Sequence, residues 1–125
     1  MPIRLDETQT ASLRAAVDRI VPADDRFPGG VEAGALDYLL RNFEDGGNLA
    51  DRLPDYRAGL DALDRIARGA HGESFPDLSD ALQDQTLMRL EQEQPRFFRA
   101  LVEHVQEGYY TSPVSWEMLG WKVTG

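Results

Sequence analysis

The chain has 125 residues, of which 42% are hydrophobic and 28% are charged, and this length and composition fit one globular domain. Its 13 Lys and Arg residues against 22 Asp and Glu residues give a net charge of −9, which opposes binding to nucleic acid and to anionic lipid surfaces. It has no cysteine, which excludes disulfides, thiolate nucleophiles and cysteine-ligated zinc or iron–sulfur sites.

The sequence contains no segment of the kind that inserts into a membrane or directs export. No apolar run approaches the roughly 20 residues that a membrane-spanning helix needs. The segment from Met1 to Glu7 has neither the apolar core of a signal peptide nor an arginine pair. We therefore expect a cytoplasmic protein for the sequence as given, or a periplasmic one if a leader was removed. We expect a single helical domain over residues 1–125, with residues 1–7 as a flexible N-terminus.

Two helices are predicted in the first third of the chain. Asp6 and Gln9 have the spacing of a capping box, and Pro22 should end the helix that begins there. The residues that share the apolar face of this helix are Leu13, Val17, Ile20 and Val21. The segment 22–30 is rich in turn formers, and a second helix is predicted over residues 31–43. Its buried stripe is predicted to be Leu36, Leu39, Leu40 and Phe43.

Three more helices are predicted in the rest of the chain. The third covers residues 54–68, with Pro54 in its first turn and Gly69 as its cap. A polar linker over residues 71–76 precedes the fourth helix, for which Ser79 is the natural N-cap, and Pro95 opens the fifth. The inward faces are predicted to hold Tyr56, Leu60, Leu63, Ile66 and Ala67, then Leu82, Leu87 and Leu90, and finally Phe97, Phe98, Leu101, Val102, Val105 and Tyr109.

The last segment, residues 110–125, is predicted to be an irregular tail that is rich in aromatic residues. No segment alternates as a strand does, so the predicted fold is all-α, an irregular bundle of about five short helices followed by this tail. Tyr109, Tyr110, Trp116 and Trp121 offer the large, stiff surface that is typical of protein interfaces. The alternative is that these rings complete the core of the protein itself.

Few residues could carry out chemistry. His71 lies in a glycine-flanked linker, and His104 with Glu107 could share a metal, but their order reverses the Glu-x-x-His pair of metal-binding bundles. Asp24 and Asp25 could bind a cation or act as acid and base, although adjacent acids in such a loop are more typical of turns. The sequence therefore predicts a protein that is not an enzyme, holds no metal or cofactor of its own, and binds another protein.

Several segments, taken in order, resemble one known family. They are Val17-Asp-Arg-Ile-Val-Pro-Ala-Asp-Asp, Pro28-Gly-Gly, Glu32-Ala-Gly, Tyr56-Arg-Ala-Gly-Leu-Asp-Ala-Leu-Asp, Phe75-Pro-Asp-Leu-Ser with Gln83-Asp, Phe97-Phe, Glu107-Gly-Tyr-Tyr-Thr-Ser-Pro and Leu119-Gly-Trp-Lys. Together they resemble the gluconate 2-dehydrogenase subunit 3 family over residues 13–121. In many members of that family a twin-arginine leader is present and the segment between Ser112 and Gly120 is longer.

The resemblance implies an accessory small subunit that stabilises a large catalytic subunit. The large subunit of that family is a glucose–methanol–choline (GMC) oxidoreductase that carries FAD, and some complexes add a cytochrome c subunit. We therefore expect a hetero-oligomer that oxidises a sugar or polyol, with FAD on the partner and no catalytic residue here. The expected partner contacts are Tyr109, Tyr110, Trp116 and Trp121, with Pro22, Asp24 and Asp25 as a secondary contact.

Two other hypotheses remain open at this point. The chain could be a stand-alone helical adaptor or a homodimer whose aromatic tail meets a second copy. It could also be a small metal-dependent enzyme that uses Asp24, Asp25, His104 or Glu107.

Overall fold

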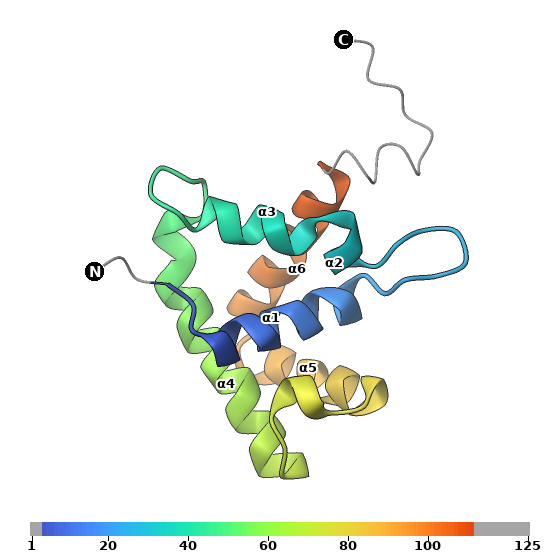
Figure 1. Ribbon diagram of the computed structural model, residues 1–125. Helices are drawn as coiled ribbons and strands as arrows, with labels where there is room; N and C mark the ends of the chain where they lie inside the picture. The colour runs from blue at the N-terminus through green and yellow to red at the C-terminus, as the bar shows by residue number, and fades with distance from the viewer. Residues whose placement is uncertain (1–3, 112–125) are drawn as a thin grey trace.

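The computed structural model describes residues 4–111, and its helices pack as an irregular all-α bundle (Figure 1), which confirms the predicted fold class. The α-helices are α1 (Glu7–Ile20), α2 (Gly30–Ala33), α3 (Ala35–Asn42), α4 (Leu53–His71), α5 (Asp80–Glu93) and α6 (Pro95–Tyr110). Two short 3₁₀ turns, η1 (Ala50–Arg52) and η2 (Phe75–Asp77), precede α4 and α5. No strand occurs within residues 4–111. Of the predicted irregular tail, residues 110–125, Tyr110 is the last residue of α6, and residues 112–125 lie outside the described residues.

Helix α1 is the centre of the bundle and contacts every other α-helix (Figure 1). The predicted capping box is present: the Gln9 amide donates to Asp6 Oδ1 at 2.7 Å, and the Asp6 amide donates to Gln9 Oε1 at 2.9 Å. The expected flexible segment 1–7 therefore overlaps the cap and the first residue of α1. The helix ends at Ile20 because Pro22 restricts Val21, the C-cap, to a non-helical conformation.

The prediction of one helix over residues 31–43 is wrong, because the chain forms two helices there. Gly34 has a φ of 100°, in the left-handed region, where it ends α2 and begins α3. Only a residue without a Cβ adopts this conformation at little cost, so the break is built into the sequence. This turn changes the direction of the chain, and in α3 the side chains of Leu36 and Leu39 are buried, whereas that of Leu40 is only partly buried.

Helix α4 is longer than predicted. Gly69 lies inside the helix, and Gly72, with a φ of 75°, is the C-cap instead. The linker that follows is not simply polar, since Phe75 is fully buried. The Asp64 carboxylate holds this segment by accepting hydrogen bonds from the Ser74 hydroxyl at 2.7 Å and the Phe75 amide at 2.9 Å.

Helix α5 begins at its predicted cap, Ser79, but its inward face differs from the prediction. Leu82 is only partly buried, whereas Gln83 is 6% exposed. Gln83 is accommodated because its Nε2 donates to the carbonyl oxygens of Phe75 and Pro76 at 3.1 and 3.3 Å. These bonds attach the η2 turn to α5.

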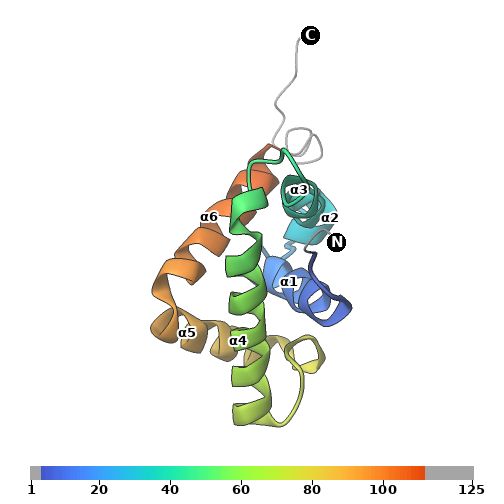
Figure 2. The same ribbon diagram turned by 90° about the vertical axis from the view of Figure 1, so that its left-hand side faces the viewer.

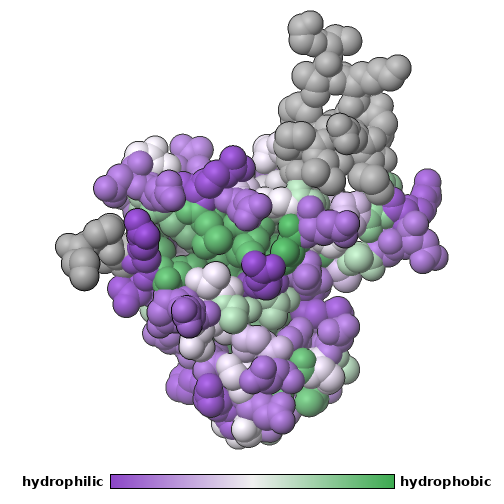
Figure 3. All heavy atoms as spheres, viewed as in Figure 1, coloured by the Kyte–Doolittle hydropathy of each residue, from purple (hydrophilic) through white to green (hydrophobic). Residues whose placement is uncertain are grey.

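Helix α4 lies along one face of the bundle. Figure 2 shows it running upright in front, with α6 to its left, α1, α2 and α3 to its right, and α5 crossing behind its lower half. The surface seen in Figure 3 is mostly hydrophilic, with an apolar band over α3 and its boundary with α1. Exposed apolar surface of this kind is where proteins commonly contact partners.

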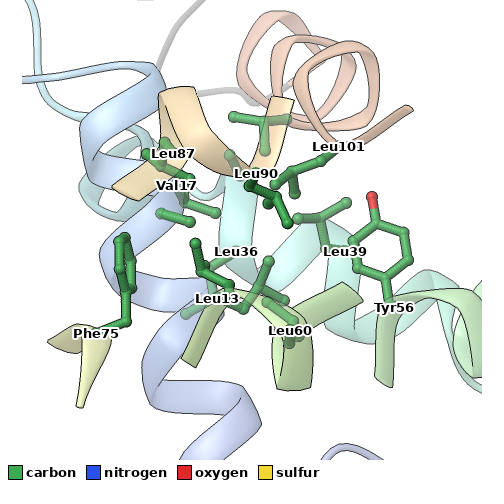
Figure 4. Close-up of a cluster of buried hydrophobic side chains, with 14 of the residues drawn as sticks. Leu13, Val17, Leu36, Leu39, Tyr56, Leu60, Phe75, Leu87, Leu90 and Leu101 are labelled. Carbon is green, nitrogen blue, oxygen red and sulfur yellow. The ribbon is translucent and has the colours of Figure 1, made fainter. Parts of the chain in front are cut away.

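The core lies where α1, α3, α4, α5 and α6 meet (Figure 4). Each of these helices contributes at least one leucine that is no more than 2% exposed. These include Leu13, Leu36, Leu39, Leu60, Leu90 and Leu101. Full burial of one such side chain contributes about 1.5–3 kcal/mol, so this apolar cluster dominates the stability of the bundle.

Candidate partner-binding surface

Many of the segments that carry the family resemblance serve packing between helices. A Cβ at Gly59 would lie 2.3 Å from the ring of Phe97, so α4 and α6 approach closely only because residue 59 is a glycine. A Cβ at Gly108 would likewise lie 2.8 Å from the Tyr38 ring, where α6 meets α3. These residues hold the helices together and leave other members of the same segments at the surface.

Four of the residues predicted to contact a partner meet at one end of the described bundle. The loop after α1 folds back against the end of α6 and encloses a surface hollow of about 330 Å³, here called the Tyr110 hollow. Its lining residues are Ile20, Val21, Pro22, Asp24, Phe27, Pro28, Gln106, Tyr109 and Tyr110. Four of the seven predicted contact residues (Pro22, Asp24, Tyr109 and Tyr110) therefore line one site.

The two tyrosines at the end of α6 have different surroundings. Tyr109 is 7% exposed, and its hydroxyl donates to the Pro28 carbonyl oxygen at 3.2 Å across 81 residues of sequence. Its ring meets that of Tyr110 edge to face, with 5.5 Å between centroids. Tyr109 thus holds the loop onto α6. Tyr110, in contrast, is 54% exposed.

The loop owes its shape to Asp24. Asp24 Oδ1 accepts hydrogen bonds from the amides of Arg26 and Phe27, both at 2.8 Å, and the Asp24 amide donates to the Phe27 carbonyl at 3.0 Å. The bonds from the Arg26 and Phe27 amides lower the pKa of Asp24, so this residue keeps a negative charge at the rim of the hollow. The Arg26 guanidinium lies 5.8 Å from the centroid of the Phe27 ring.

Of the three remaining predicted contact residues, only Asp25 belongs to the described part of the chain. Asp25 is exposed and does not line the Tyr110 hollow. Trp116 and Trp121 lie outside the described residues. Sequence reasoning missed Phe27, Pro28 and Gln106, which also line the hollow. An apolar Phe27 within a polar loop was the available signal, but nothing local shows that the loop packs against a helix some 80 residues later.

The residues considered for metal or acid–base chemistry are occupied in other ways. His104 does not pair with Glu107; its Nδ1 is hydrogen-bonded to the Tyr56 hydroxyl at 2.7 Å. His71 is the last residue of α4 and does not lie in a linker. Within the described part of the chain, no three or more His, Asp and Glu side chains gather closely enough to hold a metal ion.

Among the helices of residues 4–111, none has the length and apolar character to cross a membrane.

Comparison with known proteins gives one clear relationship. No curated protein and no solved structure shows a significant match to this chain. The sequence profile of the family described as gluconate 2-dehydrogenase subunit 3 matches residues 7–125, which is nearly the whole chain and agrees with the resemblance seen in its segments. The chain therefore belongs to the gluconate 2-dehydrogenase subunit 3 family.

Proposed function

We propose that this chain is the non-catalytic small subunit of an FAD-dependent sugar or polyol dehydrogenase, and that it binds and stabilises the catalytic flavoprotein. The observation that carries the proposal is the family match over residues 7–125, because the family is named for a subunit of a dehydrogenase. In such a complex a GMC-type partner holds FAD and supplies the redox chemistry. This chain contributes a folded surface that binds the flavoprotein and stabilises it.

The Tyr110 hollow is the part of the described surface that best suits this role. It combines a half-exposed aromatic ring with an apolar wall and one ionised carboxylate, Asp24. Tyrosine is enriched among the residues that dominate binding energy, because it buries much area at little entropic cost. The hollow is held in shape by the bond from Tyr109 to Pro28, so little ordering is needed when a partner binds.

A surface of this size would be one part of a larger contact. Stable protein interfaces bury on the order of 1,600 Å² in total, more than one 330 Å³ hollow supplies. The apolar band over α3 and α1 in Figure 3 offers a further area that a large subunit could cover. In this proposal Tyr110 supplies much of the binding energy, and the surrounding surface adds buried area and fits the shape of the partner.

Co-expression with a GMC-type flavoprotein from the same host tests this proposal. The Tyr110→Ala variant should weaken binding to the flavoprotein at least tenfold, which corresponds to about 1.4 kcal/mol. Met88→Ala is the matched control, because Met88 is the other exposed large hydrophobic residue of the described chain, 63% exposed, and lies on α5 away from the hollow. Equal weakening by both variants would exclude the hollow, and a flavoprotein that is soluble, FAD-loaded and active without this chain would exclude the function.

Self-association distinguishes the alternative function. Light scattering on the isolated chain should give the mass of a monomer if the aromatic surface serves a different protein. A tight dimer whose mass does not change with concentration would favour a homodimeric interaction protein instead.

A further inference from the structure

A second hollow, of about 590 Å³, lies between the start of α4 and the first half of α6. Arg52, Asp55, Arg96, Phe97 and His104 are among the residues that line it, and Tyr56 lies at its base, only 1% exposed. Neither the family relationship nor the proposed function gives this hollow a role. Its distinguishing feature is a buried hydroxyl paired with a titratable ring.

Tyr56 and His104 form the hydrogen bond that joins α4 to α6 at this place. The Tyr56 hydroxyl oxygen lies 2.7 Å from His104 Nδ1, and the two rings are stacked with centroids 5.8 Å apart. Phe43 and Phe97 pack edge to face against the Tyr56 ring, with centroid distances of 4.7 and 5.3 Å. The Tyr56 ring is therefore packed among aromatic rings, and within residues 4–111 the hydrogen-bond partner of its hydroxyl is His104.

The direction of this hydrogen bond depends on which nitrogen of the His104 ring carries the proton. Burial raises the pKa of Tyr56 well above its ordinary value, so the hydroxyl keeps its proton. When the hydroxyl donates to Nδ1, the neutral imidazole carries its own proton on Nε2. Burial also lowers the pKa of His104 below 6.5, which favours this neutral form.

Proton uptake by His104 would break this arrangement. A proton on Nδ1 turns the acceptor into a donor, so the Tyr56 hydroxyl would have to accept this bond and turn its own hydrogen away from the ring that had paired with it. A buried donor without a partner is costly, because it has lost its water and gained nothing in return. The α4–α6 contact is therefore weaker when His104 is charged.

Charged groups on the neighbouring elements act on the His104 ring in both directions. On α6 itself Glu107 and Glu103 favour the charged imidazole, whereas Arg52, just before α4, opposes it. Asp55 on α4 and Arg96 on α6 line the same hollow, with opposite signs. Tyr38 on α3 neighbours Glu107, and burial together with this carboxylate raises the pKa of Tyr38, so it remains uncharged.

We propose that Tyr56 and His104 form an acid-sensitive latch, which fastens α4 to α6 when His104 is neutral and releases when His104 takes up a proton. The linkage between proton binding and folding gives the direction in which pH changes the stability of the protein. Since the folded state disfavours the charged imidazole, the stability that the latch contributes is fully present above the unfolded pKa of about 6.5 and is lost as the pH falls through the folded pKa. This latch is independent of the proposed partner.

Three measurements on the isolated chain test the latch. In the ¹⁵N spectrum of the histidine rings, His104 at neutral pH should carry its proton on Nε2, with Nδ1 unprotonated, and should titrate below 6.5. In Tyr56→Phe, the neutral form loses its hydrogen-bond donor, so the His104 titration midpoint should move up. A proton on Nδ1 in the wild-type protein, or an unchanged midpoint in the folded variant, would overturn the proposal.

The third measurement follows urea unfolding between about pH 7.5 and 5.5. His104→Asn keeps a nearby hydrogen-bond acceptor that does not titrate, so its urea midpoint should fall less on acidification than that of the wild type. His71→Asn, at the other histidine of the chain, should fall as the wild type does. Equal pH dependence in all three proteins would overturn the latch, whatever their stability at neutral pH.

Discussion

Gly59→Ala is the most direct test of how α4 and α6 pack together. A Cβ at residue 59 would lie 2.3 to 2.5 Å from three atoms of the Phe97 ring, closer than real Cβ contacts allow. The ring would have to move, and it would give up its edge-to-face contact with Tyr56, whose ring centroid lies 5.3 Å away. Overpacking of this kind costs about 1–3 kcal/mol.

Gly69→Ala is the matched control, because it is the same substitution in the same helix. No atom outside the immediate surroundings of Gly69 lies within 4 Å of the Cβ that the substitution adds. Replacing a helical glycine by alanine stabilises a helix by about 0.5–1 kcal/mol, and this gain applies to both sites. The intrinsic helix preference therefore cancels in the comparison. Gly59→Ala should be less stable than Gly69→Ala by about 1–3 kcal/mol, the cost of the clash itself.

Urea unfolding followed by circular dichroism measures this difference. The same pair of substitutions in a Phe97→Ala background provides a double-mutant cycle, in which the difference should largely vanish because the clashing ring is gone. Equal stability of the two glycine variants in the wild-type background would refute the packing argument. So would a difference that persists without Phe97.

Two further substitutions and one ion pair have expected effects on the free energy of unfolding, measured in the same way. Leu90→Ala removes a fully buried side chain and should cost about 2–5 kcal/mol. Ser12→Ala removes a buried hydroxyl that has no hydrogen-bond partner within residues 4–111, so it should be neutral or stabilising by about 1 kcal/mol. Arg19 binds Asp84 through two bonds of 2.8 and 2.9 Å, and a double-mutant cycle should give a coupling of about 0.5–1 kcal/mol that falls in high salt.

The helices could be predicted because their signals are local. The capping box of Asp6 and Gln9, the Ser79 cap and the prolines at positions 22 and 95 each mark a boundary through neighbouring residues. The two errors in helix boundaries occurred where a glycine had two possible roles. Gly34 breaks a helix through its positive φ, whereas Gly69 is carried inside one, and the sequence around each looks equally permissive.

The candidate site was harder to predict because its parts come from distant segments. The aromatic pair at residues 109 and 110 suggested a surface, but only the fold shows that Tyr109 is used to hold the loop at Pro28 while Tyr110 remains half exposed. In the same way, no spacing in the sequence connects Tyr56 with His104, which lie 48 residues apart. Tertiary hydrogen bonds of this kind leave no local pattern to read.

Purification of the tagged chain from its native host, with mass spectrometry and visible absorbance recorded on the same sample, tests the central claim most directly. The account predicts that a GMC-type flavoprotein of several hundred residues co-purifies in a fixed ratio with this chain and brings the yellow absorbance of a bound flavin. A colourless chain that is recovered in high yield without such a partner would contradict it.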